Sequence, residues 1–135
     1  MSSATPASEC LTDTMGLVLR LEQHHLGSTA KVLFEAMKTG TAIIYVPAIV
    51  FAEILYLSEK KRISISLHSM EEYLARFPQC RESPLSLSVI QTAADIADVP
   101  ELHDRLIAAT ARIRNVELII NDPVIQASTF VRTTW

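Results

Sequence analysis

The chain has 135 residues, 49% of them apolar, which is enough for one domain with a sizeable core. Its formal net charge of −3 argues against a protein that binds duplex DNA by charge alone, and three Gly and six Pro argue against a loop-rich or disordered chain. The two cysteines, Cys10 and Cys80, lie far apart and outside any CxxC pattern, so we expect reduced intracellular thiols rather than a zinc site.

Residues 1–8 are small and polar, and they are interpreted as a flexible N-terminal tail before a single domain at 9–135. This stretch has neither the positive charge nor the apolar segment of a signal peptide. The longest apolar run, at 42–57, is interrupted by Pro47 and Glu53, which argues against a membrane span. We therefore expect a soluble cytoplasmic protein without a membrane partner.

Hydrophobic periodicity and turn residues predict strands that alternate with helices. In chain order the expected elements are a strand at 9–12, helices at 15–23 and 28–38, a strand at 42–46, helices at 47–61 and 66–77, a loop at 78–84, a strand at 85–87, helices at 89–97 and 100–115, a strand at 117–120, a short helix from 122 and an edge strand at 131–135. This alternation predicts an α/β three-layer sandwich with a mainly parallel sheet of about four to five strands. In such sheets ligands bind beyond the carboxyl ends of the strands, where the strand order reverses.

Glu53 is the only charged residue between positions 42 and 57. On a helix it shares a face with four apolar residues, Ile49, Val50, Tyr56 and Leu57. A carboxylate buried there without a partner is costly, so it must be neutral, paired or bound to a cation. For this residue taken alone, a helix edge that reaches solvent or a buried pair with an arginine remains the alternative.

Asp13 and Asp122 each close a predicted strand and begin the following helix. An N-cap is one explanation, because Asp is a favoured residue at that position. The other is a ligand site, since the carboxyl ends of parallel strands lie at one edge of the sheet. For either residue considered alone, the N-cap is the favoured explanation.

Asp104 lies near the start of the helix predicted at 100–115, and Ile107, Ala108 and Ala111 follow at i+3, i+4 and i+7. The small side chains predict a close approach of this helix to the sheet, with the carboxylate at the head of the contact. The alternative is a first-turn Asp favoured by the helix dipole and paired with Arg105 or His103.

If the four acids converge on one cleft, they form a metal site, although their separations of 40, 51 and 18 residues do not by themselves establish that they converge. Clustered carboxylates repel one another and persist when cations are bound. Carboxylate oxygens suit Mg²⁺ or Mn²⁺ rather than zinc, and such an ion activates a water and stabilises charge on a phosphodiester. We therefore expect the same four residues to be metal ligands and catalytic residues of a nuclease: Asp13, Glu53, Asp104 and Asp122.

At these residues the chain resembles the PIN domain family, in particular the VapC-like toxin ribonucleases of toxin–antitoxin modules. The segments that carry the resemblance, in family order and spacing, are LTDT at 11–14, VPAIVFAEILYLSEKKRI at 46–63, PELHDRLIAATA at 100–111 and ELIINDPVI at 117–125. They span nearly the whole chain, and HDRLIAATA within the third segment is the most specific.

The resemblance implies an α/β sandwich around a parallel sheet, Mg²⁺ or Mn²⁺ binding, endoribonuclease activity on an RNA substrate, a homodimer, and inhibition by an antitoxin protein. By position, the four acids match the acidic quartet of the family, and Thr14 and Asn121 match polar neighbours that help to hold a carboxylate or a water. The chain departs from the family pattern at Ile120, where Thr or Ser is common before the Asn-Asp pair, and in a longer N-terminal tail.

Two further segments have more than one interpretation. The run Lys60-Lys61-Arg62 is typical of a solvated helix end, and it also suits contact with RNA phosphate. The apolar stripe at 67–77 suits the core, a dimer surface or a groove for an antitoxin helix.

Two rival functions are weighed against the nuclease. A phosphotransfer enzyme with Asp13 as its nucleophile would have a second Asp two residues later, where Met15 stands. A catalytically weak or inactive PIN-like module that binds RNA or protein is the stronger rival, and the intact acidic quartet argues against it.

Overall fold

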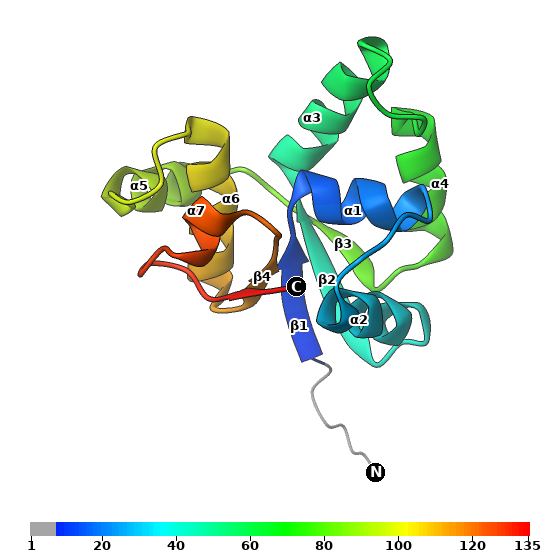
Figure 1. Ribbon diagram of the computed structural model, residues 1–135, viewed down its shortest axis with the longest axis horizontal. Helices are drawn as coiled ribbons and strands as arrows, with labels where there is room; N and C mark the ends of the chain where they lie inside the picture. Colours follow the sequence, from blue (N-terminus) through cyan, green and yellow to red (C-terminus); the bar gives the residue numbers. More distant parts are fainter. Residues whose placement is uncertain (1–7) are drawn as a thin grey trace.

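The computed structural model describes residues 8–135 and consists of one parallel sheet between two layers of helices (Figure 1). All five strands are parallel, in the order β3-β2-β1-β4-β5. The strands are β1 (Ser8–Thr12), β2 (Ala42–Pro47), β3 (Cys80–Ser83), β4 (Glu117–Ile119) and β5 (Thr133–Thr134). The predicted tail lies outside the described residues except for Ser8, which begins β1.

Seven helices cover the two faces of the sheet in the described part of the chain. They are α1 (Thr14–Leu21), α2 (Ser28–Lys38), α3 (Ala48–Glu59), α4 (Leu67–Arg76), α5 (Leu87–Asp95), α6 (Leu102–Arg114) and α7 (Pro123–Gln126). Helices α1 to α4 lie on one side and α5 to α7 on the other (Figure 1). The predicted α/β sandwich with a parallel sheet is confirmed. Within residues 8–135, no helix has the length and apolarity that a membrane span requires.

The core lies on both sides of the three central strands. Leu11 of β1, Ile44 of β2 and Leu118 of β4 are completely buried. Strands covered on both faces are expected to be apolar along their length, and this explains why these segments lack polar alternation. On α6, Ala108 and Ala111 are also fully buried, as the small-residue pattern predicts for a helix that approaches the sheet closely.

The strand order reverses beside β1. The chain first adds β2 and β3 on one side of β1 and then places β4 and β5 on the other side. The switch point therefore lies between the carboxyl ends of β1 and β4, which is where parallel α/β sheets bind their ligands.

The strand predicted at 85–87 is wrong. The third strand is β3, inside the segment predicted as a loop at 78–84. Its sequence, CRES, buries only Cys80 and Ser83 because it forms one edge of the sheet, so it lacks the apolar run of a central strand. Leu87 begins α5 instead, after the N-cap Ser86, and its side chain is 69% exposed.

Two smaller expectations also change. Pro47 is the last residue of β2 and the N-cap of α3, rather than a residue of the first helical turn. Helix α3 carries apolar residues on nearly all sides, and some of them, such as Leu55 and Tyr56, are exposed. The side chain of Glu53 is only partly buried. The prediction that Glu53 lies on a buried apolar face therefore holds only in part.

Candidate metal centre

Asp13 lies directly after β1 and forms the N-cap of α1. Its backbone N–H donates to the carbonyl of Ile119 in β4 at 3.2 Å, so the residue is fixed at the switch point. Its Oδ1 accepts a hydrogen bond from the backbone N–H of Gly16 at 2.8 Å. Oδ1 therefore serves the helix cap, so the N-cap explanation holds for Asp13, while its role as a metal ligand stays a prediction.

Glu53 projects from the second turn of α3 and is held by the neighbouring helix. The hydroxyl of Thr14, the first residue of α1, donates to Glu53 Oε1 at 2.7 Å. Thr14 is buried, so this contact fixes the carboxylate of α3 relative to the end of β1. The partner of Glu53 is thus a hydroxyl, not the arginine that the alternative explanation required.

Asp104 lies in the first turn of α6, next to a second acid. Glu101 is the N-cap of this helix, and its carboxylate accepts hydrogen bonds from the backbone N–H groups of His103 at 3.0 Å and Asp104 at 2.9 Å. The carboxylate of Asp104 itself is therefore not needed to cap the helix, and it remains available at the sheet edge.

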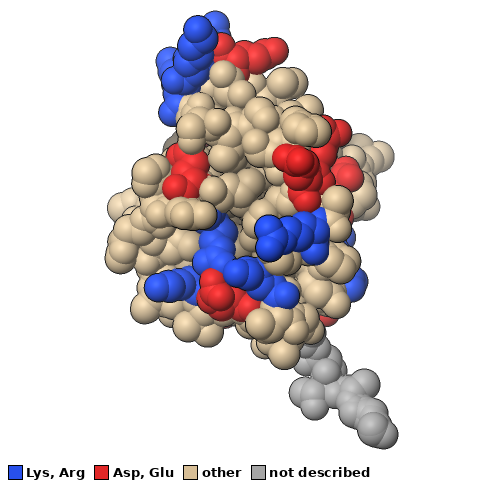
Figure 2. Space-filling model, turned by 90° about the vertical axis from the view of Figure 1, so that its right-hand side faces the viewer, with Lys and Arg blue, Asp and Glu red and all other residues tan. Residues whose placement is uncertain are grey.

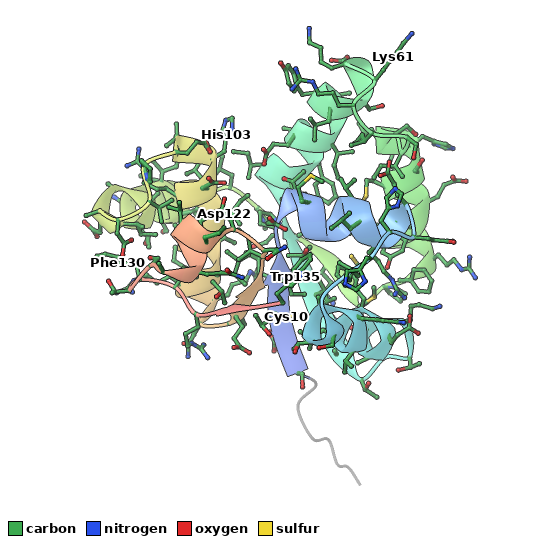
Figure 3. The ribbon with its side chains drawn as sticks, in the orientation of Figure 1. Cys10, Lys61, His103, Asp122, Phe130 and Trp135 are labelled. Carbon is green, nitrogen blue, oxygen red and sulfur yellow. The ribbon has the colours of Figure 1, made fainter. Side chains whose placement is uncertain are left out.

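Asp122 follows β4 and is the N-cap of α7, with Oδ1 accepting from the backbone N–H of Val124 at 2.8 Å. Asn121 is exposed, and its side chain enters none of the hydrogen bonds found between residues 8 and 135. Ile120, which stands where the family often has Thr or Ser, is buried. Figure 3 shows Asp122 and His103 on the same side of the molecule, at neighbouring element ends.

The four carboxylates influence one another electrostatically. Burial is the largest cause that raises the pKa of Asp13 to about 7; the charges of Glu53, Asp104 and Asp122 also raise it, and the Gly16 hydrogen bond lowers it. Burial and the charge of Glu101 raise the pKa of Asp104 to about 6, with smaller contributions from Asp122 and Glu53. The sheet edge thus collects negative charge that a cation would neutralise.

The donor set fits a hard divalent cation in chemistry. All four side chains offer carboxylate oxygens, the ligand type that Mg²⁺ and Mn²⁺ prefer. Between residues 8 and 135, however, no three acidic, histidine or cysteine side chains already form a cluster with the spacing of a metal site. Binding would therefore require the carboxylates to come closer together, and the charge of the bound cation would offset the repulsion among them and favour the ionised forms of Asp13 and Asp104.

The site includes two residues that the sequence analysis missed. A Cβ atom at Gly16 would lie 2.7 Å from Thr12 Oγ1 and 3.0 Å from Asp13 Oδ1, so only glycine lets α1 begin this close to the carboxylate. Glu101 caps α6 and raises the pKa of Asp104. The position of Gly16, three residues after an N-cap Asp, was a detectable signal in the sequence. Glu101 gave no such signal, because Glu is an uncommon N-cap residue.

The match to a family model covers residues 11–129 and is to the PIN domain. This chain belongs to the PIN domain family. The family expected from the four acidic segments is confirmed, and the matched region contains all four acids. No curated protein matches the chain.

Solved structures share the fold of this PIN domain at low sequence identity. VapBC2 from Rickettsia felis, solved bound to a promoter DNA fragment, is 17% identical, with a TM-score of 0.71 over 94% of this chain and 98% of the other. A DNA-bound VapBC from Salmonella typhimurium is 13% identical, with a TM-score of 0.68 over 96% and 98%. A toxin–antitoxin complex from Klebsiella pneumoniae is 19% identical, with a TM-score of 0.62 over 89% and 92%.

Proposed function

We propose that this PIN domain is an endoribonuclease that depends on Mg²⁺ or Mn²⁺ and acts as the toxin of a toxin–antitoxin pair. The observation that carries the proposal is that Asp13 and Asp122 follow the neighbouring parallel strands β1 and β4 at the switch point, where the charges of Glu53, Asp104 and Asp122 raise the pKa of Asp13. The likeness to toxin–antitoxin complexes supports the biological setting.

In this proposal Asp13, Glu53, Asp104 and Asp122 would hold the ion. A bound ion would supply positive charge for the phosphate and acidify a water at neutral pH. Thr14 orients Glu53 through its hydroxyl, and Glu101 orients the first turn of α6 that carries Asp104. Asp13 and Asp104 would be partly protonated near neutral pH without a cation, so ion binding and their ionisation are coupled.

Cleavage of single-stranded RNA by the purified protein tests this function. We expect cleavage in Mn²⁺, none in EDTA, and a loss of at least about 100-fold in the Asp104→Asn and Asp122→Asn variants, because each removes a charged ligand. Glu71→Gln, which removes an exposed carboxylate on α4, is the matched control and is expected to cleave normally. RNA binding without cleavage would identify an inactive binding module instead, and cleavage without metal would refute the assignment.

The proposal includes an antitoxin that docks in a groove between α1, α2 and α4. This hollow has a volume of about 1140 Å³, and none of the four acids lines it. Its lining includes the apolar side chains of Tyr73 and Phe77 and carries more cations than acids, namely Arg20, Lys31, Lys38 and Arg76 against Glu72. Figure 2 shows this face, where blue side chains gather around the hollow. Such a surface suits an amphipathic helix with acidic side chains.

Co-expression with the protein encoded next to this chain tests the antitoxin site. The complex is expected to form with the wild-type chain and to weaken by at least about tenfold in the Arg76→Glu variant, because the variant places like charges opposite each other. Equal affinity for wild type and variant would exclude this face as the docking site.

The proposal also includes a homodimer in the cytoplasm. Leu85, Leu87 and Ile90 expose apolar surface at the start of α5, which a second copy would cover. The free cysteines, Cys10 and Cys80, are both buried, which suits a reducing compartment. Light scattering of the purified chain tests the dimer, and Ile90→Glu is expected to yield monomers if this surface is used.

A further inference from the structure

The outer end of α3 carries a group of exposed side chains that the proposed metal site does not use. We call Tyr56, Lys60, Lys61 and Arg62 the α3 tip. Tyr56 is 53% exposed, and all three cations are exposed. Figure 3 shows Lys61 at the far end of α3, and Figure 2 shows the blue cluster projecting from the body at this point.

The spacing of these residues places them on the same side of α3 as Glu53. Tyr56 follows Glu53 at i+3 and Lys60 follows at i+7, so one helix face presents a carboxylate, an aromatic ring and an ammonium group in turn. At 1.5 Å per residue, Tyr56 lies about 4–5 Å and Lys60 about 10 Å beyond Glu53 along the axis. That length corresponds to about three stacked nucleotides at 3.4 Å each.

The side chains at the tip form a local arrangement without acidic partners. Lys60 Nζ lies 5.7 Å from the centroid of the Tyr56 ring. In the part of the chain that the structure describes, the side chains of Lys60, Lys61 and Arg62 enter no hydrogen bond or ion pair, whereas the side chain of Arg20 pairs with Glu35 and that of Arg114 donates to Ser83. Three consecutive cations therefore keep their charge available in a chain whose net charge is −3.

The backbone of Lys61 marks the end of α3. Its φ angle is 57°, in the left-handed region that follows many helices and that favours glycine or asparagine. Lysine is mildly strained in this conformation, which Gln23 and Asn115 also adopt after their helices, so the angle itself assigns no function. Glycine at this position would relieve the strain but would remove a cation.

The geometry points to the α3 tip as a binding surface for single-stranded RNA that leads the strand into the carboxylate site. Tyr56 stacks on a base next to the cleaved bond, and Lys60, Lys61 and Arg62 hold the phosphates beyond it. Aromatic side chains beside cations form the usual contact surface for single strands, because every base has a face that can stack. This inference deepens the proposed function and rests on it for the identity of the substrate.

Binding measurements in an inactive background separate the tip from the chemistry. A short fluorescein-labelled single-stranded RNA is titrated, in Mg²⁺, against full-length protein carrying Asp104→Asn, with and without changes at the tip. We expect Tyr56→Ala to weaken binding about fivefold or more and Tyr56→Phe to keep it within about twofold, since phenylalanine also stacks. Removing all three cations should make the dependence of log K on log salt shallower by about 2, at roughly 0.7 per phosphate contact.

Lys61→Gly distinguishes a functional lysine from a structural one. The Lys61→Gly variant is expected to have a melting temperature no lower than that of the wild type, because glycine relieves the strain. It is also expected to bind RNA about threefold more weakly, because a cation is lost. In the active protein the same change should raise KM and leave kcat unchanged. Gln23→Gly is the backbone control, since Gln23 also has a positive φ of 61°. Arg81→Ala is the charge control, since it removes an exposed cation elsewhere. Both controls are expected to bind RNA as the parent does.

The outcomes separate this inference from the proposed function. Normal RNA binding in the tip variants, or equal loss in the controls, would overturn the inference and leave the nuclease assignment standing. If the wild-type chain does not cleave RNA but the tip variants lose RNA binding, the α3 tip would be supported as an RNA-binding surface and the nuclease assignment would be refuted. Equal affinity of the wild-type chain for duplex RNA would overturn the stacking role of Tyr56.

Discussion

Leu11 and Asp13 lie two residues apart at the end of β1, and their surroundings have opposite effects on stability. Leu11 is completely buried between the two helical layers. Asp13 also lies in a mostly buried position, but burial and three neighbouring acids raise its pKa to about 7. The interior of the strand stabilises the fold, while the end of the same strand holds charge that the fold disfavours. That contrast indicates that the sheet edge is built for a ligand rather than for stability.

The largest effect is expected inside the sheet. Leu11→Ala removes a fully buried side chain from the central strand and should lower the free energy of unfolding by about 3–4 kcal/mol. Urea unfolding followed by circular dichroism measures the change. A loss below about 1 kcal/mol would show that the core around β1 tolerates a cavity, and the contrast with Asp13 would then fail.

The pH dependence of stability is the next test. Because the pKa values of Asp13 and Asp104 are about 7 and about 6 in the folded chain, against 3.8 when unperturbed, the folded state keeps these protons to higher pH than the unfolded state does. The free energy of unfolding of the metal-free protein should therefore fall as pH rises from about 4 to about 7, and then level off. Thermal melts in EDTA check this, and a contribution that rises with pH would contradict it.

A substitution at the strand end should act opposite to one in the strand interior. Asp13→Asn retains an N-cap side chain and removes the charge, so it should stabilise the metal-free protein at pH 8 by about 2 kcal/mol. The same variant should lose the stabilisation that Mn²⁺ gives to the wild type. Destabilisation by Asp13→Asn would mean that the carboxylate serves the fold after all.

The smallest effect is expected from the hydroxyl that holds Glu53. Thr14→Val removes the donor at 2.7 Å from Glu53 Oε1 with little change in shape. Its affinity for Mn²⁺ should fall about tenfold, as found when partners of metal ligands are removed. Titration calorimetry measures this, with Thr41→Val on an exposed turn as the control. Equal affinities of the two variants for Mn²⁺ would show that the Thr14 hydroxyl does not contribute to metal binding.

The central strands could be predicted from the sequence because they are buried on both faces and therefore read as apolar runs, as at Leu11, Ile44 and Leu118. The edge strand β3 could not, since it buries only Cys80 and Ser83 and its pairing with β2 depends on the whole sheet.

For the site, the types and positions of the acids predicted a metal ion, but the sequence could not place Asp13 and Asp122 at neighbouring strand ends, because that depends on the reversal in strand order. Gly16 could be recognised from its place three residues after an N-cap Asp, whereas Glu101 could not, because Glu is an uncommon N-cap. The role of Asn121 stays a prediction.

A crystal structure of the full chain grown with Mn²⁺ and measured at the manganese absorption edge tests the central claim most directly. We predict an anomalous peak among Asp13, Glu53, Asp104 and Asp122, with carboxylate oxygens at about 2 Å from it. A peak bound elsewhere on the molecule, or well-ordered carboxylates without any peak at saturating Mn²⁺, would contradict the assignment of these four residues as a metal site.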